Sequence, residues 1–338
     1  MPPLPALGGK FCVEGLPSIC EKPVPRVAAL HTHFSLNQLP RARQPSSQRW
    51  RHMQTWIDNA ILVHGQRKSG TTLLQNLLDG SEHVFVYPAE LKLQWLIGKW
   101  TNVESYYRLA DSQLSEHSWD NFSYSNYRKM WEEARAAGQI RSLEQAVRFD
   151  ARAAHASSVM FPRDPQMWCT KEIGAPTDRL VTSWLKMFPQ GKVLLITRNP
   201  RMTIRAILND RRRRGIQMNA RRIAEIIYET LLVRRQQRRL GTNRAVMTVS
   251  YEDLTSDTES EMKKVSYFLG VPYNNVFSIP TVLSEPVVVK TSSVKTFAVF
   301  QPAQSWRQGL TVRERVLVEL LVPAMRAVIS LREWLGSR

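Results

Sequence analysis

Residues 61–72 of the chain read ILVHGQRKSGTT, and this stretch decides the fold. The apolar run at 61–63 is partly β-branched and is followed closely by Gly65, which is the pattern of a buried strand. Leucines at 73, 74, 77 and 78 then form one apolar stripe with helical spacing, and Gly80 is placed to end the helix. A strand, a glycine-containing turn and a helix in this order can bind phosphate through free backbone N–H groups.

The alternation of strands and helices continues along the chain. Apolar runs predict further strands over 84–87, where Pro88 ends the run, over 192–197 and over 245–249. Helical spacing predicts helices through most of 91–160 and a further helix that begins at about Pro200. It also predicts helices over 177–188, 220–240, 259–269 and 312–331. The stretch 271–310 is expected to be loop-rich. We therefore expect an α/β fold in which helices flank both faces of a central parallel sheet.

Composition and charge narrow the class of protein. The chain has 338 residues, of which 43% are hydrophobic, so wholesale disorder is excluded. Residues 1–55 are rich in proline and predict a basic N-terminal arm, whereas 56–338 predict a single domain. The formal net charge is +18, which favours anionic partners such as nucleic acid, phosphorylated or sulfated ligands, acidic glycans or a membrane surface.

Compartment and metal content follow from a few residue types. The three cysteines, Cys12, Cys20 and Cys169, exclude a disulfide scaffold. The sequence contains no run of about 18 apolar residues, so no transmembrane helix is predicted. The N-terminus lacks the apolar core of a signal peptide. We therefore expect a soluble, cytoplasmic protein. The seven histidines show no metal-ligand spacing, so no metal site is predicted.

The glycine loop differs from that of nucleotide kinases. Gly65 and Gly70 have the spacing of G-x-x-x-x-G-K-[ST], but Thr71 stands where the lysine should be, and Lys68 lies inside the loop. The strand over 192–197 is followed by Arg198 rather than by an acid that could hold magnesium. A P-loop kinase or NTPase is therefore disfavoured, although it stays as an alternative.

Four segments, in order along the chain, resemble one family. The G-x-x-K-x-G-T-T pattern after a strand resembles the 5′-phosphosulfate loop of sulfotransferases that use 3′-phosphoadenosine 5′-phosphosulfate (PAPS). The same family is resembled by VLLITRNPR at 193–201, by VSYEDL at 249–254 with FLGVP at 268–272, and by SWRQGL at 305–310. The resemblance covers about residues 60–330, and its motifs are more similar to glycan-modifying and bacterial-type members than to cytosolic members with a histidine base.

The resemblance implies a reaction and a set of donor-binding residues. It implies a P-loop-like fold, PAPS as co-substrate, 3′-phosphoadenosine 5′-phosphate (PAP) as product, no metal, and in-line transfer of a sulfuryl group to a hydroxyl or amine. It places Lys68 at the bridging oxygen, where negative charge develops in the transition state, and Arg198 at the 3′-phosphate. The other residues that it implies for donor binding are Arg67, Ser69, Gly70, Thr71, Thr72, Trp306 and Arg307.

The general base is left between three candidates. Many glycan-modifying members have a glutamate about twenty residues past the loop glycine, and Glu90 stands twenty residues after Gly70. Glu172 is the reserve candidate, and a histidine is the base in cytosolic members. Lys171, in the segment WCTKE at 168–172, resembles a family lysine near the sulfate or the acceptor.

One position departs from the family pattern. The family has a serine eight residues after the arginine of the 3′-phosphate site, and this chain has Ala206 there. The contact that this serine makes with the 3′-phosphate is therefore either missing in this chain or supplied by Arg201, Arg205 or Asn209. A catalytically disabled relative that binds a polyanion or nucleic acid therefore stays as a second alternative.

The acceptor cannot be identified from a motif. Residues 198–239 contain thirteen arginines and three acids, which suits an anionic acceptor such as a sulfated or carboxylated glycan, a nucleic-acid or membrane-surface contact, or simply a solvated helical face. No nucleic-acid-binding signature is present, so nucleic acid is disfavoured. A small metabolite or a glycan is the expected class of acceptor.

Overall fold

The structure is a computed structural model that describes residues 56–93, 103–159, 164–287 and 305–336, with short pieces at 289–290, 295–296 and 299. The arm expected over 1–55 lies outside the described residues, as do Cys12 and Cys20. All described residues belong to one compact unit, Pro45–Arg338.

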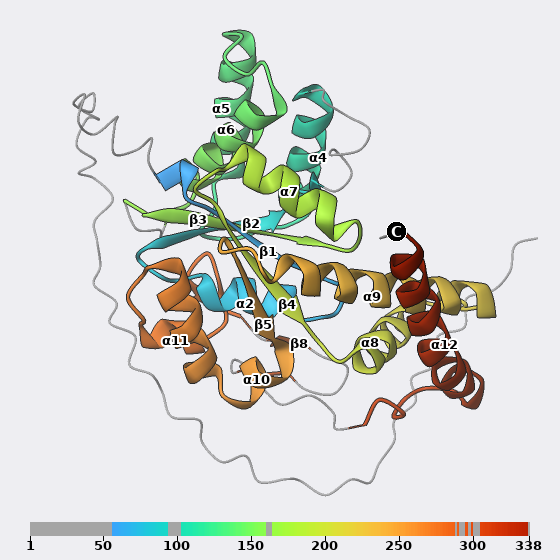
Figure 1. Cartoon of the computed structure of the whole chain (residues 1–338). Coiled ribbons are helices and arrows are strands. Elements are labelled where there is room, and N and C mark those ends of the chain that lie inside the picture. Colours follow the sequence, from blue (N-terminus) through green and yellow to red (C-terminus); the bar gives the residue numbers. More distant parts are fainter. Residues whose placement is uncertain are drawn as a thin grey trace, which may run out of the picture. The chain divides into compact units, whose positions relative to one another are not determined.

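A five-stranded sheet runs through the unit, and every neighbouring pair of its strands is parallel (Figure 1). Its order is β2-β3-β1-β4-β5, with β1 at Ala60–Gly65, β2 at Val84–Glu90, β3 at Met167–Ile173, β4 at Lys192–Thr197 and β5 at Val246–Ser250. The expected parallel sheet is confirmed. Because β3 and β4 lie on opposite sides of β1, the chain order reverses there, and ligands of such folds bind beyond the strand ends at this point.

Helices cover both faces of the sheet (Figure 1). One face carries α4 (Val103–Ser115), α5 (Tyr124–Ala136), α6 (Leu143–Ala156) and α7 (Thr177–Met187), and the other carries α2 (Thr71–Leu78), α10 (Tyr251–Ser256) and α11 (Thr258–Leu269). β1 is therefore buried along its whole length, which explains its unbroken apolar run. A third apolar cluster joins α8 (Pro200–Arg213), α9 (Ala220–Leu240) and α12 (Val312–Gly336).

Short elements occupy the described parts of the stretch expected to be loop-rich. They are η1 (Asn275–Ser278), β6 (Thr281–Val282), β7 (Glu285–Pro286), β8 (Val289–Lys290) and β9 (Lys295–Thr296). β6 pairs with β7, and β8 pairs with β9, in two antiparallel hairpins. No helix in the described ranges is long and apolar enough to cross a bilayer.

Two strands differ from their sequence-based expectation. β3 was not among the predicted strands, because polar residues at 170–172 interrupt its apolar pattern although most of it is buried. β2 was expected to end at Pro88, and this is wrong, since the strand continues to Glu90. β2 is an edge strand with an irregular register between Val86 and Glu90. A proline, which has no backbone N–H to donate, is therefore tolerated at position 88.

Aromatic side chains of α4 and α5 pack around a buried acid. The hydroxyls of Tyr106 and Tyr127 each donate to the carboxylate of Asp150 at 2.6 Å, and the Trp131 Nε1 donates to it at 3.3 Å. Burial raises the pKa of Asp150, and these donors oppose the rise. These aromatics are therefore core residues of the helical layer.

Candidate active site

The loop between β1 and α2 depends on its two glycines. A Cβ on Gly65 would lie 2.5 Å from the Oγ of Ser69 and 2.7 Å from the carbonyl oxygen of Ile196. Gly70 has a φ of 108°, and a Cβ there would lie 2.3 Å from the Cδ2 of Tyr251. Neither position accepts a side chain, so the glycine spacing of the sequence sets the shape of this loop.

The start of α2 presents unsatisfied donors to this loop. No side chain caps α2, and its first turn contains no acidic residue. Ser69 is buried, and its Oγ has no hydrogen-bond partner. The backbone N–H groups of the first helical turn and the partial positive charge of the helix end add to this hydroxyl. This set of donors fits a phosphate or sulfate group.

Three other loop residues were expected to bind the donor. Thr71 is buried and Thr72 is exposed at the first two positions of α2. The backbone N–H of Arg67 donates to the Oε1 of Gln66 at 3.1 Å. The Arg67 side chain is half-buried and has no hydrogen bond or ion pair within the described part of the chain. The loop therefore places one uncompensated cation next to the helix start.

Lys68 reaches α8 from the loop. Its Nζ lies 2.8 Å from the Oδ1 of Asp210. The Asp210 carboxylate also pairs with Arg213 and with Arg214, each at 3.3 Å. Partial burial tends to raise the pKa of Asp210, but these three cations outweigh it, and the pKa is lowered. Asp210 was not among the site residues expected from the sequence. Its position four residues after Ala206, on the same helix face, is the signal that could have revealed it.

Glu90, Lys171 and Thr72 lie together at the carboxyl ends of β2 and β3. The Nζ of Lys171 donates to the Oγ1 of Thr72 at 3.1 Å and lies 3.8 Å from the Oε1 of Glu90. The other oxygen of Glu90 accepts from the Nζ of Lys92 at 2.7 Å. Burial lowers the pKa of Lys171, and Glu90 opposes this. Glu90 and Lys171, which were expected at the site from separate segments, thus lie together beside Thr72 of α2. Nothing in the sequence had indicated a role for Lys92.

Glu172 points to the opposite face of the sheet from Lys171, since neighbouring side chains on a strand alternate. Its Oε1 accepts from the backbone N–H of Leu93 at 2.8 Å, and its Oε2 has no partner. Burial raises the pKa of Glu172 to about 8.

His64 is buried beside the same strand. Its ring nitrogens contact the carbonyl oxygen of Glu172 at 2.9 Å and the Oγ1 of Thr177 at 3.1 Å. Burial lowers the pKa of His64 to about 4, so the ring is neutral at physiological pH. This histidine is held in the core.

Replacing Glu172 with glutamine is expected to stabilise the protein more at high pH than at low pH. The folded pKa of Glu172 is raised to about 8 from 4.5, so stability falls as pH rises between these values. The difference in unfolding free energy between Glu172→Gln and the parent should therefore grow by about 2–5 kcal/mol from about pH 5 to about pH 8, measured by urea denaturation. The same difference at both pH values would contradict the shifted pKa.

Arg198 leaves the end of β4 toward Tyr251. Its NH1 donates to the carbonyl oxygen of Lys68 at 2.9 Å, and its guanidinium lies 4.2 Å from the centre of the Tyr251 ring. Its Nε is buried without a partner. Burial lowers the pKa of Arg198, and the charge of Arg205 acts in the same direction. An anion beside this guanidinium would compensate a charge that the protein only partly satisfies.

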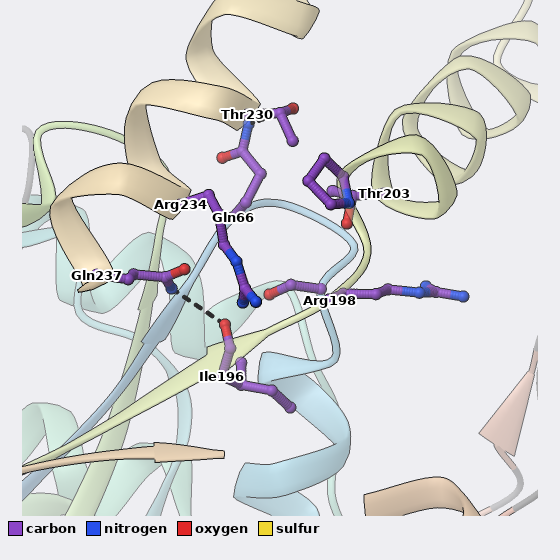
Figure 2. A pocket seen from close by; sticks show the side chains of 9 residues that line it. Gln66, Ile196, Arg198, Thr203, Thr230, Arg234 and Gln237 are labelled. Carbon is purple, nitrogen blue, oxygen red and sulfur yellow. Dashed lines mark hydrogen bonds between the residues drawn. The ribbon is translucent and has the colours of Figure 1, made fainter. Parts of the chain in front are cut away.

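A small polar pocket lies between the loop, β4 and α9 (Figure 2). Its cavity of about 10 Å³ has room for about one water molecule. The Nε2 of Gln66 donates to the Oγ1 of Thr230 at 3.3 Å, and the Nε2 of Gln237 donates to the carbonyl oxygen of Ile196 at 3.1 Å. Figure 2 shows Arg234 entering from α9 while the Arg198 side chain points the other way. These two hydrogen bonds therefore connect the loop and β4 to α9.

Trp306 and Arg307, expected at the donor site, lie against α8 and α12, respectively. The guanidinium groups of Arg201 and Arg307 each lie 5.3 Å from the Trp306 ring, and Arg307 pairs with Glu319. Neither Trp306 nor Arg307 has a hydrogen bond or ion pair with loop residues 65–72, all of which are described. The structure therefore does not join them directly to the loop.

The residues expected to replace a serine at position 206 face the same segment. Arg201 stacks on Trp306, and the Nε of Arg205 donates to the carbonyl oxygen of Gln308 at 2.7 Å. The side-chain oxygen of Asn209 accepts from Arg212 at 3.2 Å. All three thus hold or adjoin the segment before α12.

Many arginines of α8 and α9 have partners within the chain. Arg212 pairs with Glu314, Arg221 with Glu225, and Arg239 with Asp178, and two more bind Asp210. Part of the arginine-rich stretch is therefore structural. Within the described ranges, no group of three histidine, cysteine or acidic side chains could hold a metal ion.

Several solved structures of sulfotransferases have a similar fold. The sulfotransferase domain of the Synechococcus PCC 7002 olefin synthase aligns over 77% of this chain and 94% of its own, with 18% identity and a TM-score of 0.52. The sulfotransferase domain from the curacin biosynthetic pathway aligns over 78% and 97%, with 15% identity and a TM-score of 0.47. Mouse sulfotransferase SULT7A1, complexed with PAP, aligns over 78% and 83%, with 11% identity and a TM-score of 0.43.

These structural likenesses and the sequence carry different weight. Of the three, only the olefin synthase domain scores above 0.5, and at its level of identity it supports the fold alone. No curated protein matches in sequence. The family model described as "Sulfotransferase family" matches residues 60–275, which is more than half of the chain. The chain therefore belongs to the sulfotransferase family.

Proposed function

We propose that this protein transfers a sulfuryl group from PAPS to a hydroxyl or amine of an acceptor, with Glu90 as the general base. The observation that carries the proposal is the set of contacts from Glu90 through Lys171 to Thr72. These contacts hold a carboxylate beside the start of α2, where the loop presents its unsatisfied donors. A site for an anionic donor and a proton acceptor thus lie next to each other.

The chain's own groups fit the donor at both of its charged ends. PAPS, when bound, would supply the sulfuryl group, and PAP would leave. The loop residues Arg67, Ser69, Gly70, Thr71 and Thr72 hold the 5′-phosphate and sulfate oxygens through backbone N–H groups and side chains. Arg198 binds the 3′-phosphate, since its Nε is buried without a partner. Trp306 and Arg307 join this site through α8 and Arg201.

Three side chains carry the chemistry. Glu90 accepts the proton of the acceptor as the new bond to sulfur forms. Lys68 stabilises the electron pair that stays on the phosphate oxygen as the old bond to sulfur breaks. To do so its ammonium exchanges the carboxylate of Asp210 for the donor. Lys171, held between Glu90 and Thr72, contacts the sulfate oxygens.

Donor selection is tested by ligand-dependent unfolding. The thermal midpoint is measured with PAP, with AMP, and with ATP and magnesium, all at one concentration, and a ligand for which this is about 100 times its Kd should add roughly 2.7 kcal/mol of stability. Preference for PAP, followed by transfer of label from PAPS to a glycan or small hydroxylated acceptor, supports the proposal. Preference for ATP with magnesium would point to a kinase, and failure to bind PAP would point to a disabled relative.

Replacing Arg198 with alanine is expected to weaken PAP binding by about 10- to 100-fold, because a bidentate bond to the 3′-phosphate is lost. AMP has no 3′-phosphate, so its affinity should change much less. Calorimetric titration of both ligands into Arg198→Ala and the parent measures this. Arg198→Lys serves as a control that keeps the charge and loses the planar fork. Equal losses for PAP and AMP would instead show that Arg198 acts on the loop through Lys68.

A further inference from the structure

Helix α12 is apolar on two sides. Its inner side packs through Val318, Val322 and Ile329 into a cluster with residues of α8 and α9. Ten large apolar side chains are exposed in the described part of the chain, and six of them lie on α12, at 49% to 74% exposure: Val312, Val316, Leu320, Val328, Leu331 and Leu335. Figure 1 shows α12 beside α8 and α9, away from the strands. No described part of the chain therefore covers the second apolar side.

The six side chains form one continuous stripe. They recur at intervals of three or four residues, apart from one gap between Leu320 and Val328 that exposed Pro323 and Ala324 fill. Such spacing places them on one face of the helix. At 1.5 Å per residue, the stripe from Val312 to Leu335 is about 35 Å long. This is far more than the scattered single apolar residues that a protein surface normally shows.

The exposed charges on α12 have one sign among the side chains that the structure describes. Among the α12 side chains that the structure describes, the exposed charged ones are Arg313, Arg315 and Arg326. Glu314 is buried against Arg212, and Glu319 pairs with Arg307. With a net charge of +18, two copies of the chain would repel each other across such a face. The partner that fits is apolar and negatively charged.

A cavity continues this surface at the start of α12. It has a volume of about 420 Å³ and lies between the first turn of α12 and the connection from α8 to α9. Its lining combines Ile216, Met218 and Ile223 with Arg313 and with the Arg212–Glu314 pair. Apolar side chains and an arginine that is unpaired among the described residues thus also line a concave site of molecular size.

We propose that the outer face of α12 docks the protein on an anionic phospholipid bilayer. The stripe enters the boundary between headgroups and acyl chains, and Arg313, Arg315 and Arg326 face lipid phosphates and carboxylates. Such a face combines apolar burial with electrostatic attraction between each arginine and the anionic lipid surface. The proposal is independent of sulfuryl transfer, because it rests on α12 alone.

Vesicle binding by the full chain tests this docking. We expect the chain to sediment with phosphatidylcholine vesicles that contain phosphatidylserine, to bind vesicles of phosphatidylcholine alone more weakly, and to dissociate as salt rises. Leu320→Glu and Leu331→Glu should each reduce binding about tenfold or more. Each substitution removes a leucine that the bilayer would bury and adds a negative charge. Arg313→Gln and Arg326→Gln should weaken only the phosphatidylserine-dependent part.

A matched control separates the stripe from added charge. Tyr267 on α11 is 90% exposed, so Tyr267→Glu adds the same charge far from the stripe and should leave binding unchanged. The thermal midpoint of each variant verifies its fold. Absence of binding to phosphatidylserine vesicles, or equal losses in Tyr267→Glu and Leu320→Glu, would overturn the proposal. A dimer that Leu320→Glu converts to monomer would overturn it in favour of a second copy.

Discussion

Lys68→Ala is expected to lower kcat by about 100- to 1,000-fold while the affinity for PAP changes by less than about tenfold. Negative charge on the bridging oxygen is low in PAPS and develops as the bond to sulfur breaks, so the ammonium stabilises the transition state more than the complex with PAPS. Steady-state kinetics with PAPS and calorimetry with PAP measure the two quantities separately.

The fold should survive this substitution. Asp210 keeps Arg213 and Arg214 as partners when Lys68 is removed, so its buried charge stays compensated. Asp210→Asn is the matched control, since it frees Lys68 from the same ion pair and leaves the ammonium in place. It should bind PAP at least as tightly as the parent does. If Lys68→Ala weakened PAP binding as much as it lowered kcat, Lys68 would be a binding residue rather than a transition-state contact.

Glu90→Gln is expected to lower kcat by about 100- to 10,000-fold with PAP affinity nearly unchanged. The amide has the shape of the carboxylate but cannot accept the acceptor's proton. Lys171 retains its bond to Thr72, so the start of α2 should keep its geometry. The residual activity should also lose the acidic limb of the pH–rate profile, which reports protonation of the base. Rates from about pH 5 to about pH 9 measure this.

The reserve base provides the control for this experiment. Glu172 is buried on the opposite face of the sheet from Lys171, so Glu172→Gln should transfer sulfuryl groups at a near-normal rate. Unchanged kcat in Glu90→Gln together with a large loss in Glu172→Gln would exchange the two assignments. Loss of kcat in both, with the acidic limb intact, would instead indicate a base in neither position.

The parallel sheet and the loop could be predicted because their signals are local. β1 is buried on both faces and reads as an apolar run, and the glycines at 65 and 70 stand close together in one turn, where Gly70 has a φ of 108°. α9 was predicted with its observed bounds for the same reason, since its stripe repeats over many turns. β3 gave no such signal, because polar residues of the site replace the apolar residues that periodicity requires.

The contacts between segments needed the tertiary structure. Lys68 and Asp210 are 142 positions apart in the chain, and Lys171 and Thr72 are 99 apart, so no spacing rule relates them. Packing of α8 against the loop, and the pairing of β2 with β3, bring these groups together. Equally, the sequence marks α12 as an apolar helix, but only packing against α9 shows which side remains uncovered.

The sequence by itself therefore determined four of the five strands of the sheet, the glycine loop and the candidate residues, because these depend on neighbours along the chain. The tertiary structure decided which carboxylate adjoins the loop and which is buried away from it. Alternation along β3 sends Lys171 and Glu172 to opposite faces of the sheet. Only the pairing of β3 with β2 places Glu90, rather than Glu172, beside the lysine that contacts Thr72.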